Sequence, residues 1–337
     1  MRQLEFYYSL QHSFPLMKVH KVYAKKNAIW PFTVVGRPPQ EDTSFGQLIH
    51  ELTGSALQEE IPGLKEVHAV DAAGVHPLLL AIGSERYTPY TPAKQPAEIL
   101  TIANHILGTG QLSLAKFLFI TADDENKPDS HRVSTHNVQA YLEFVLKRID
   151  LARDIHFYTN TTIDTLDYSG TSLNSGSKVV LAAYGDIKRE LATSVPAALQ
   201  QLSDFENAKL AMPGVVVLQT AAFENYDKAA MQIAALNEQL KNADLNSVPL
   251  IILADDATFT AANMRNFLWV SFTRCNPSHD IYGVNSFTEN KHWGCRGPLV
   301  IDARIKPHHA PPVEIDSAVE KKINRLFEKG GSLHGKI

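Results

Sequence analysis

An internal repeat is the feature that most constrains the fold of this chain. An apolar segment that ends in Ala-Asp-Asp occurs twice, at residues 117–124 and at residues 250–256. Because a repeat in sequence marks a structural unit that is built more than once, we expect one unit in two copies. In each copy an Asn precedes an Arg by eleven residues, and an Asp-Ile pair begins six residues after that Arg: Asn137, Arg148 and Asp154 in the first, Asn263, Arg274 and Asp280 in the second.

Each copy alternates short apolar strands with helical segments. Continuous apolar strands of this kind are typical of parallel sheets that helices cover on both faces. The sequence therefore predicts an α/β fold with internally duplicated βαβ units and a mostly parallel sheet. The expected strands lie at residues 78–80, 117–120 and 178–183 in the first copy and at residues 214–218, 250–253 and 298–303 in the second, with helices at 96–107 and 226–240.

The segment before the repeat has a different pattern. Residues 16–23 alternate as a strand does, Lys25-Lys26-Asn27 is typical of a turn, and residues 29–35 form a second strand. Gly-Arg-Pro-Pro-Gln-Glu-Asp then ends that strand and begins a helix, for which Gly54 is the expected stop. The predicted organisation is strands at residues 1–40, a linking helix at 41–64, repeats at 65–195 and 196–312, and a C-terminal helix and tail at 313–337.

Composition excludes several classes of protein. The net charge is −4 without a long basic run, which argues against a nucleic-acid partner. The apolar runs are too short to span a bilayer, and the first residues lack the apolar region of a secretory leader. With only Cys275 and Cys295 present, the chain is expected to be soluble and cytoplasmic.

Several residue groups are candidates for chemistry, and each has a structural alternative. The pairs Asp123-Asp124 and Asp255-Asp256 follow apolar strands, where they would bind a cation or act as acid and base, or else cap the next helix. Two half-sites have zinc-like spacing, and the alternative is buried thiols with surface histidines; the four residues are Cys275, His279, His292 and Cys295. Arg148 and Arg274 are each expected to form a buried pair with the Asp six residues later.

Three blocks of the sequence resemble the UbiD family of prenylated-flavin-dependent carboxy-lyases. They are Phe-Thr-Val-Val-Gly-Arg-Pro-Pro-Gln-Glu-Asp at residues 32–42, the block at 117–124, and Arg148 with Asp154-Ile155. The resemblance implies an N-terminal α/β domain and a split β-barrel that hold the flavin, and a C-terminal α/β domain that drives oligomerisation. Residues 1–40 would then be a short β remnant of the split barrel.

One departure from the family pattern decides how far the resemblance extends. The family carries catalytic acids in Glu-Gly-Pro-Phe-Gly shortly before Tyr-Tyr-Ser; here Tyr7-Tyr8-Ser9 is present and the acidic motif is not. The chain thus resembles the C-terminal part of such an enzyme, with no catalytic residue of its own. Prenylated FMN and a divalent metal, Mn or Mg, belong to the complete enzyme, and none is expected on this chain. The implied partners are a missing N-terminal flavin-binding region and further copies of the chain.

The resemblance also implies candidate site residues. The family's C-terminal domain offers a loop towards the flavin, and the matching residues here are Gly110, Gln111 and Lys116. Substrate-pocket lining is expected from Ser113, Leu114 and Phe117 and, on weaker grounds, from Ile61 and Ile163; ordinary core and loop packing is the alternative for each. A glycine turn beside a strand also lets backbone amides approach a phosphate, although this is not the GxGxxG pattern.

Two functions remain open from the sequence. The first is the C-terminal part of a decarboxylase that acts on an aromatic or α,β-unsaturated carboxylic acid through prenylated FMN, in a family known for ubiquinone biosynthesis. The second is a non-catalytic α/β oligomerisation module that is inert as an isolated chain.

Overall fold

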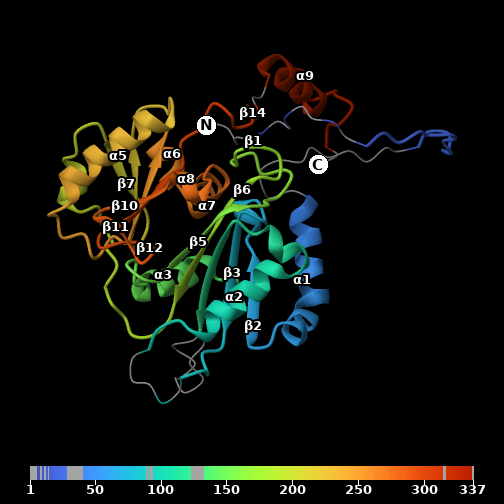
Figure 1. Ribbon diagram of the computed structural model, residues 1–337. Helices are drawn as coiled ribbons and strands as arrows, with labels where there is room; N and C mark the ends of the chain where they lie inside the picture. Colours follow the sequence, from blue (N-terminus) through green and yellow to red (C-terminus); the bar gives the residue numbers. More distant parts are fainter. Residues whose placement is uncertain are drawn as a thin grey trace.

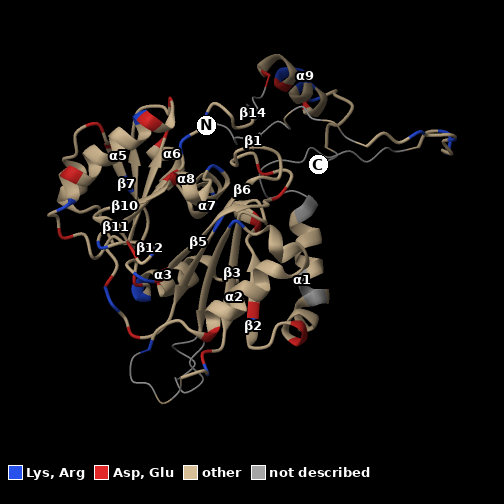
Figure 2. Ribbon diagram, in the orientation of Figure 1, with Lys and Arg blue, Asp and Glu red and all other residues tan. Residues whose placement is uncertain are grey.

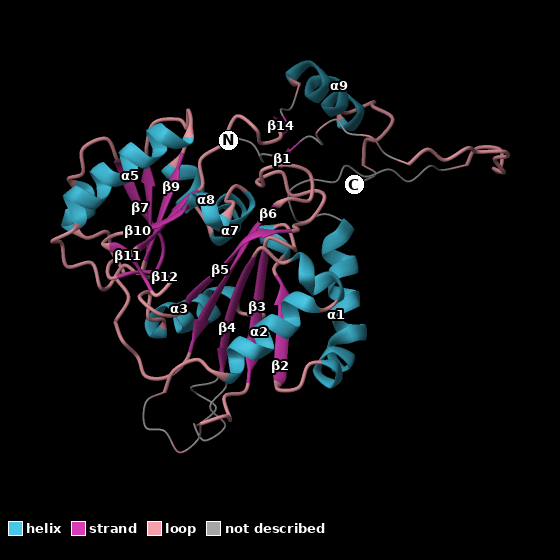
Figure 3. Ribbon diagram, in the orientation of Figure 1, coloured by secondary structure: helices cyan, strands magenta, loops and turns pink. Residues whose placement is uncertain are grey.

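The computed structural model describes residues 6–7, 10, 13, 15–28, 41–88, 90, 94–122, 133–313 and 316–335. The strand predicted at 29–35, the Gly-Arg-Pro-Pro-Gln segment and Asp123-Asp124 lie outside the described residues. The described part consists of two larger β-sheets with helices around and between them (Figures 1 and 3).

The two sheets have the same topology, which confirms the α/β fold and the duplication. In each sheet three central strands run parallel, and each edge strand is antiparallel to its neighbour. The order of the first sheet is β2 (Leu64–Ala69), β3 (Leu78–Gly83), β4 (Phe117–Ala122), β6 (Gly176–Ala183) and β5 (Ile155–Thr161). The order of the second is β7 (Glu206–Met212), β8 (Val215–Gln219), β9 (Leu250–Ala254), β13 (Leu299–Asp302) and β10 (Ile281–Gly283).

Helices cover both faces of each sheet, as continuous apolar strands require. Alternate residues of β4 point to opposite cores: Phe117 lies in the core that both repeats share, and Leu118 lies in the outer core of the first sheet. Helix α2 (Glu98–Gly108) contributes to that outer core, and α5 (Tyr226–Leu240) contributes to the outer core of the second sheet. Helices α3 (Val138–Arg148) and α7 (Met264–Thr273) contribute to the shared core, which contains residues of both sheets.

The two helices of the shared core are built alike. The side chain of Asn137 caps α3 by accepting from the backbone N–H of Ala140, and Asn263 caps α7 through the N–H of Asn266. At the contact between repeats, Phe272 of α7 meets Phe117 of β4 edge-on, with ring centroids 4.9 Å apart. The asparagines noted in the sequence repeat are therefore helix caps.

The predicted Arg–Asp pairs are wrong in their partners, although Arg274 is buried and lies 3.4 Å from another aspartate, Asp255. Asp154 pairs with Arg153, with 2.5 Å between Nε and Oδ1, whereas Arg148 donates to the carbonyl of Phe144 and covers its ring. Asp280 pairs with Lys306. The duplication persists in a different bond: both aspartates accept the backbone N–H four residues earlier, from Asp150 at 2.9 Å and from Asn276 at 2.7 Å. Six-residue spacing across a turn did not determine which side chains face each other.

The N-terminal predictions need two corrections. Residues 16–23 form no strand in the described structure, where their large apolar side chains are exposed; two strands alone do not bury a core, and the split-barrel remnant is not confirmed. The predicted turn at Lys26-Asn27 is present, with Ala28 N–H bound to Lys25 O. Helix α1 (Glu41–Glu60) begins where expected but continues past Gly54 and ends before Pro62 and Gly63, whose φ is +88°.

Smaller elements complete the fold. Strand β1 (Phe6–Tyr7) pairs with β14 (Pro312–Val313), and helix α9 (Ser317–Phe327) follows at the position expected for the C-terminal helix. None of the helices among the described residues is long and apolar enough to cross a membrane. The remaining elements are η1 (Asp71–Ala73), η2 (Gly110–Leu114), α4 (Ala197–Gln200), α6 (Ala257–Ala261), α8 (Pro277–Asp280), β11 (Ser286–Glu289) and β12 (His292–Cys295).

A close backbone approach between the repeats gives a first prediction. A Cβ on Gly294 of β12 would lie 2.6 Å from the carbonyl oxygen of Ala152, in the turn between α3 and β5. Gly294→Ala is therefore expected to lower the free energy of unfolding by about 1–3 kcal/mol, because backbone atoms must shift. Urea unfolding measures this. Gly46→Ala, which meets no atom within 4 Å in helix α1, is the control, and equal losses in both variants would contradict the prediction.

Candidate functional site

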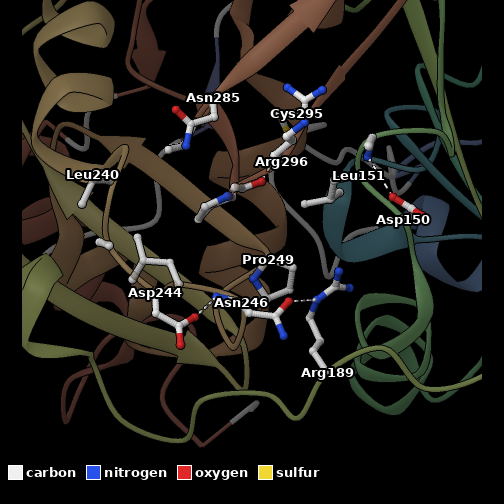
Figure 4. Close-up of a pocket in the computed structure, with 16 residues that line it drawn as sticks. Asp150, Leu151, Arg189, Leu240, Asp244, Asn246, Pro249, Asn285, Cys295 and Arg296 are labelled. Atoms are coloured by element: carbon white, nitrogen blue, oxygen red, sulfur yellow. Dashed lines mark hydrogen bonds between the residues drawn. The ribbon is translucent and has the colours of Figure 1, made fainter.

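A cleft of about 360 Å³ lies between the two repeats (Figure 4). The first repeat contributes the turn after α3, and the second contributes the loops that precede β9 and β13. The lining residues are Asp150, Leu151, Ala152, Arg189, Leu240, Ala243, Asp244, Leu245, Asn246, Pro249, Val284, Asn285, Cys295, Arg296, Gly297 and Pro298. None of the residues predicted to contact the cofactor or the substrate is among them.

Arg189, one of the two arginines that line this cleft, is engaged by the protein itself. Arg189 Nη1 donates to the carbonyls of Leu146 and Ile149 at 2.7 and 2.8 Å. Its Nε donates to Asn246 Oδ1 at 3.3 Å (Figure 4). It thereby binds the carbonyl end of α3, where cations are favoured. The cleft also lies at the amino ends of β9 and β13, whereas open α/β sheets bind ligands at the carboxyl ends. The contacts of Arg189 and the position of the cleft indicate that this region joins the two repeats structurally.

The residues predicted to contact the cofactor lie on and just after η2. Gly110 has φ +45° and open space around its Cβ position, and Gln111 is exposed. Lys116 is buried, with 1% of its side chain exposed, and its Nζ lies 2.7 Å from Asp167 Oδ2 and 2.6 Å from Ser169 Oγ. Lys116, a predicted cofactor contact, thus holds the loop after β5.

The residues predicted to line a substrate pocket divide into two groups. Ser113 and Leu114 are half-buried on η2. Ile61, Phe117 and Ile163 are fully buried within the protein, which agrees with the alternative of core packing. The assignment of these five residues to a substrate pocket stays a prediction.

Sequence reasoning missed a second buried lysine next to η2. Lys178 of β6 is 4% exposed and donates to the backbone carbonyl of Ser113. Burial lowers the pKa of Lys178 to about 8. The available signal was a lysine inside an apolar strand, in Gly-Ser-Lys-Val-Val-Leu at residues 176–181. Lys178 therefore holds η2 in place through its contact with the backbone carbonyl of Ser113.

A buried charge cluster at the carboxyl end of β13 was also missed. Arg304 binds Asp302 through Nε at 2.9 Å and Nη2 at 2.6 Å, and its Nη1 donates to Ala221 O and Gln232 Oε1. Lys306 lies 3.3 Å from Asp280 Oδ1 and donates to the carbonyl of Asp302 at 2.9 Å. The signal was the alternation Asp-Ala-Arg-Ile-Lys directly after an apolar strand. Because these groups bind each other, the cluster is built as a structural tie.

The carboxyl group of Asp280 gives a pH-dependent prediction. Burial raises the pKa of Asp280 to about 6, above the usual 3.8, and the charge of Lys306 opposes that shift without cancelling it. A raised carboxyl pKa contributes stability that is complete below about pH 4 and is lost as the pH rises through 6. The wild type should therefore lose roughly 2–3 kcal/mol relative to Asp280→Asn between pH 4 and 7. Urea titrations at both pH values test this, and a constant difference would contradict it.

The other candidate groups have structural roles in the described part of the chain. Asp256 caps α6 by accepting from Phe259 N–H at 2.9 Å, and Asp255 accepts from Ile305 N–H at 2.8 Å, so the helix-cap and loop-amide alternative holds for this pair. Cys275 and Cys295 are buried free thiols, and burial raises the pKa of each. No group of three or more possible metal ligands occurs among the described residues, so the zinc-like half-sites do not meet in one set.

Comparison with known proteins adds to these observations. Residues 43–183 match the family described as 3-octaprenyl-4-hydroxybenzoate carboxy-lyase C-terminal domain. A Chlamydia pneumoniae protein, named as one of the subunits of 4-hydroxybenzoate decarboxylase, is 36% identical over 325 residues, covering 95% of this chain and 50% of that protein. An uncharacterized protein of Archaeoglobus fulgidus is 26% identical over 177 residues, covering 52% of this chain and 34% of that protein. The chain spans about half the length of the curated chlamydial relatives it matches.

Solved structures give weaker likenesses. A vanillic acid decarboxylase of Sedimentibacter hydroxybenzoicus in its open form matches with TM-score 0.31 and 16% identity, covering 45% of this chain and 29% of that chain. The UbiD-class enzyme HmfF from Pelotomaculum thermopropionicum, in complex with FMN, matches with TM-score 0.30 and 13% identity. This match covers 45% of this chain and 31% of that chain. Both TM-scores are below 0.5, so these likenesses carry no argument about function. Residues 43–183 thus match the C-terminal domain of the UbiD carboxy-lyase family, and the similarity to the chlamydial protein extends along 95% of the sequence.

Proposed function

We propose that this chain is the C-terminal part of a UbiD-like decarboxylase that acts on an aromatic or α,β-unsaturated carboxylic acid. In this proposal the chain contributes oligomerisation and part of the pocket wall, and prenylated FMN supplies the electron sink for loss of CO2 when it is bound by the complete enzyme. The observation that carries the proposal is the family match at residues 43–183. A cytoplasmic location and a role in ubiquinone biosynthesis belong to the same proposal.

The predicted cofactor residues do not by themselves fit a flavin phosphate. Lys116 is buried in its contacts with Asp167 and Ser169, and Lys178 is held on the carbonyl of Ser113, so each ammonium group already has protein partners. The exposed polar side chain at this place is Gln111, which carries no charge. We therefore propose that the flavin is held by other parts of the complete enzyme.

The part of the chain best suited to a pocket wall is η2. Its Gly110 and Gln111 are exposed, and Ser113 and Leu114 are half-buried. Two hydrogen bonds stabilise the turn of η2. The N–H of Ser113 donates to Thr109 O, and its hydroxyl donates to Gly110 O. Such a wall would restrict substrate shape, whereas the reactive groups would come from the part of the complete enzyme that this chain does not span. Ile61, Phe117 and Ile163 would support it from behind by packing.

A chimera tests this function. The chain replaces the matching half of the Chlamydia pneumoniae relative, the chimera is loaded with prenylated FMN and a divalent metal, and CO2 release is measured with 4-hydroxybenzoate and a panel of aromatic and α,β-unsaturated acids. We expect decarboxylation of at least one acid. Leu114→Trp should change the ranking of the acids, and Leu166→Trp, at a side chain that is 66% exposed, is the matched control. A soluble, flavin-loaded chimera that releases no CO2 from any acid would contradict the proposal.

The second function is a non-catalytic oligomerisation module. The shared core of two sheets favours it, because packing alone accounts for that architecture. This hypothesis predicts that the isolated chain self-associates, retains no prenylated FMN, and leaves the chimera inert. Light scattering and flavin absorbance after gel filtration separate the two functions.

A further inference from the structure

The cleft between the repeats takes the place in the second repeat that η2 has in the first. Overlay of the two Ala-Asp-Asp segments shifts residue numbers by 255 − 123 = 132 positions. The same shift places the end of α2, Gly108, on the end of α5, Leu240, without a gap. The cleft residues 243–246 are therefore the counterparts of residues 111–114, which include three of the residues predicted for the cofactor and the pocket wall. Each segment precedes a central parallel strand, β4 in one sheet and β9 in the other.

The cleft is open because two lysine side chains of the first repeat have no counterpart in the second. Next to η2, Lys116 pairs with a carboxylate and Lys178 donates to the carbonyl of Ser113. The shift of 132 positions puts Val248 in place of Lys116, and the strand registers put Gly297 in place of Lys178. The resulting space of about 360 Å³ lies within the range of ligand pockets, roughly 300–1,000 Å³.

A half-buried arginine of this cleft has no carboxylate partner among the described residues. Figure 2 shows Lys and Arg residues gathered at the C-terminal end of α3 and on the segment beside it. Lys147 and Lys188 pair there with Glu190 and Asp150, at 3.5 and 3.6 Å. Arg189 forms no such pair in the described part of the chain, and burial lowers its pKa. Its Nη1 is bound to two carbonyls, whereas Nη2 donates to no described residue. A cation that is partly removed from water without a counter-charge favours an anion.

A second donor lies beside this guanidinium. Arg189 Nε donates to Asn246 Oδ1 at 3.3 Å, and the Nδ2 of the same amide donates to no described residue (Figure 4). The two oxygens of a carboxylate accept from a pair of donors of this kind. The other arginine of the cleft, Arg296, is 64% exposed and lies 3.6 Å from Glu289. Apolar side chains form much of the remaining lining: Leu151, Leu240, Leu245, Pro249, Val284 and Pro298.

We propose that this cleft binds a small monocarboxylic acid with an apolar or aromatic body, whose carboxylate accepts from Arg189 Nη2 and Asn246 Nδ2. Two aspartates limit the charge of the ligand: Asp244 is exposed and accepts the N–H of Asn246 at 3.3 Å, and Asp150 lies on the other side of the cleft. Their negative charges disfavour dianions. Because Arg189 belongs to the first repeat and Asn246 to the second, the bound acid links the repeats. This inference goes beyond the proposed function and does not rest on it.

Isothermal titration of the isolated chain with benzoate tests the site. We expect binding at one site per chain. Asn246→Asp should weaken it by about 10- to 100-fold, because the variant supplies the guanidinium with a carboxylate from the protein itself. Asn246 is exposed, so the variant should fold, and urea unfolding checks this. Asn104→Asp adds the same charge at an exposed position of α2 outside the cleft, and it should leave the dissociation constant unchanged.

Two further measurements test the position and the selectivity of the site. Benzoate should slow amide hydrogen exchange at residues 243–246 and 295–298 and leave exchange at 110–114 unchanged. It should also raise the melting temperature of the wild type, because it binds only the folded chain, and should not raise that of Asn246→Asp. Terephthalate and inorganic phosphate should bind at least about 10-fold more weakly than benzoate, and Asp244→Asn should narrow this difference.

Several results would overturn the proposal: no binding of benzoate in the millimolar range, binding that Asn246→Asp leaves intact, or slowed exchange at residues 110–114 in place of 243–246. Equal affinity for phosphate and benzoate would reject a monocarboxylate as the ligand. The experiments use the isolated chain without flavin, so they separate this inference from the proposed function. An inert chimera rejects only the decarboxylase, and an active chimera whose isolated C-terminal chain binds no benzoate rejects only the cleft site.

Discussion

Replacing Arg304 with Met is expected to lower the free energy of unfolding by about 3–5 kcal/mol. The guanidinium and the carboxylate of Asp302 are each about 1% exposed, with 2.6 Å between Nη2 and Oδ2. Removal of Arg304 leaves the carboxylate buried without its cation, and it also leaves Ala221 O and Gln232 Oε1 without their donor. Urea unfolding at pH 7 measures the loss.

Burial, and not charge pairing as such, is the cause of this loss. Arg296→Met is the matched control, because Arg296 lies 3.6 Å from Glu289 with both side chains 64% exposed. It should change stability by less than about 1 kcal/mol. The double change Arg304→Met with Asp302→Leu should recover much of the stability, since an apolar pair needs no counter-charge. Equal losses in the Arg304 and Arg296 variants would refute the explanation.

Lys116→Met should have an effect of similar size, a loss of about 3–5 kcal/mol, in protein that has never been exposed to flavin. Its partner Asp167 is 5% exposed and would lose the ammonium group that lies 2.7 Å away. Because Lys116 precedes β4 and Asp167 lies after β5, the pair fixes a loop that returns to the first sheet. Thermal unfolding and urea unfolding both report the loss.

An exposed lysine with an equally short contact is the control for Lys116. Lys241 lies 2.6 Å from Glu238, but the two side chains are 43 and 66% exposed, and Lys241→Met should cost less than about 1 kcal/mol. Lys116→Met with Asp167→Asn should regain part of the stability. If Lys116→Met left stability unchanged and weakened only flavin retention by the chimera, the lysine would be a cofactor residue, as the sequence predicted, and not a structural one.

Most of the fold could be predicted from patterns of apolar residues and repeats in the sequence. Runs of fully apolar residues predicted the central strands, and the repeat predicted that the sheets would be related, because burial on both faces leaves such strands few alternatives. The segment at residues 16–23 shows where this logic fails. Its alternation is that of a strand, but a strand also needs a neighbour, and the described structure pairs it with none.

The candidate site was less predictable, because side-chain partners depend on geometry across the whole fold. Asp154 selects the adjacent Arg153 over Arg148, and Lys116 selects Asp167, which is 51 positions later in the sequence. Spacing along the chain contains no information on such pairings. Lys178 and Arg304 were overlooked for a related reason: a charge within or after an apolar run usually marks a surface, and here neighbouring strands and helices cover it.

The core that joins the two sheets has a consequence for each repeat on its own. The inward faces of the two sheets contribute to one core, in which Phe272 of one repeat contacts Phe117 of the other. Expressed alone, either repeat would expose a large apolar surface to water, and such a surface favours aggregation. Each repeat is therefore expected to depend on the other for solubility, and deletion of either one should destabilise the one that remains.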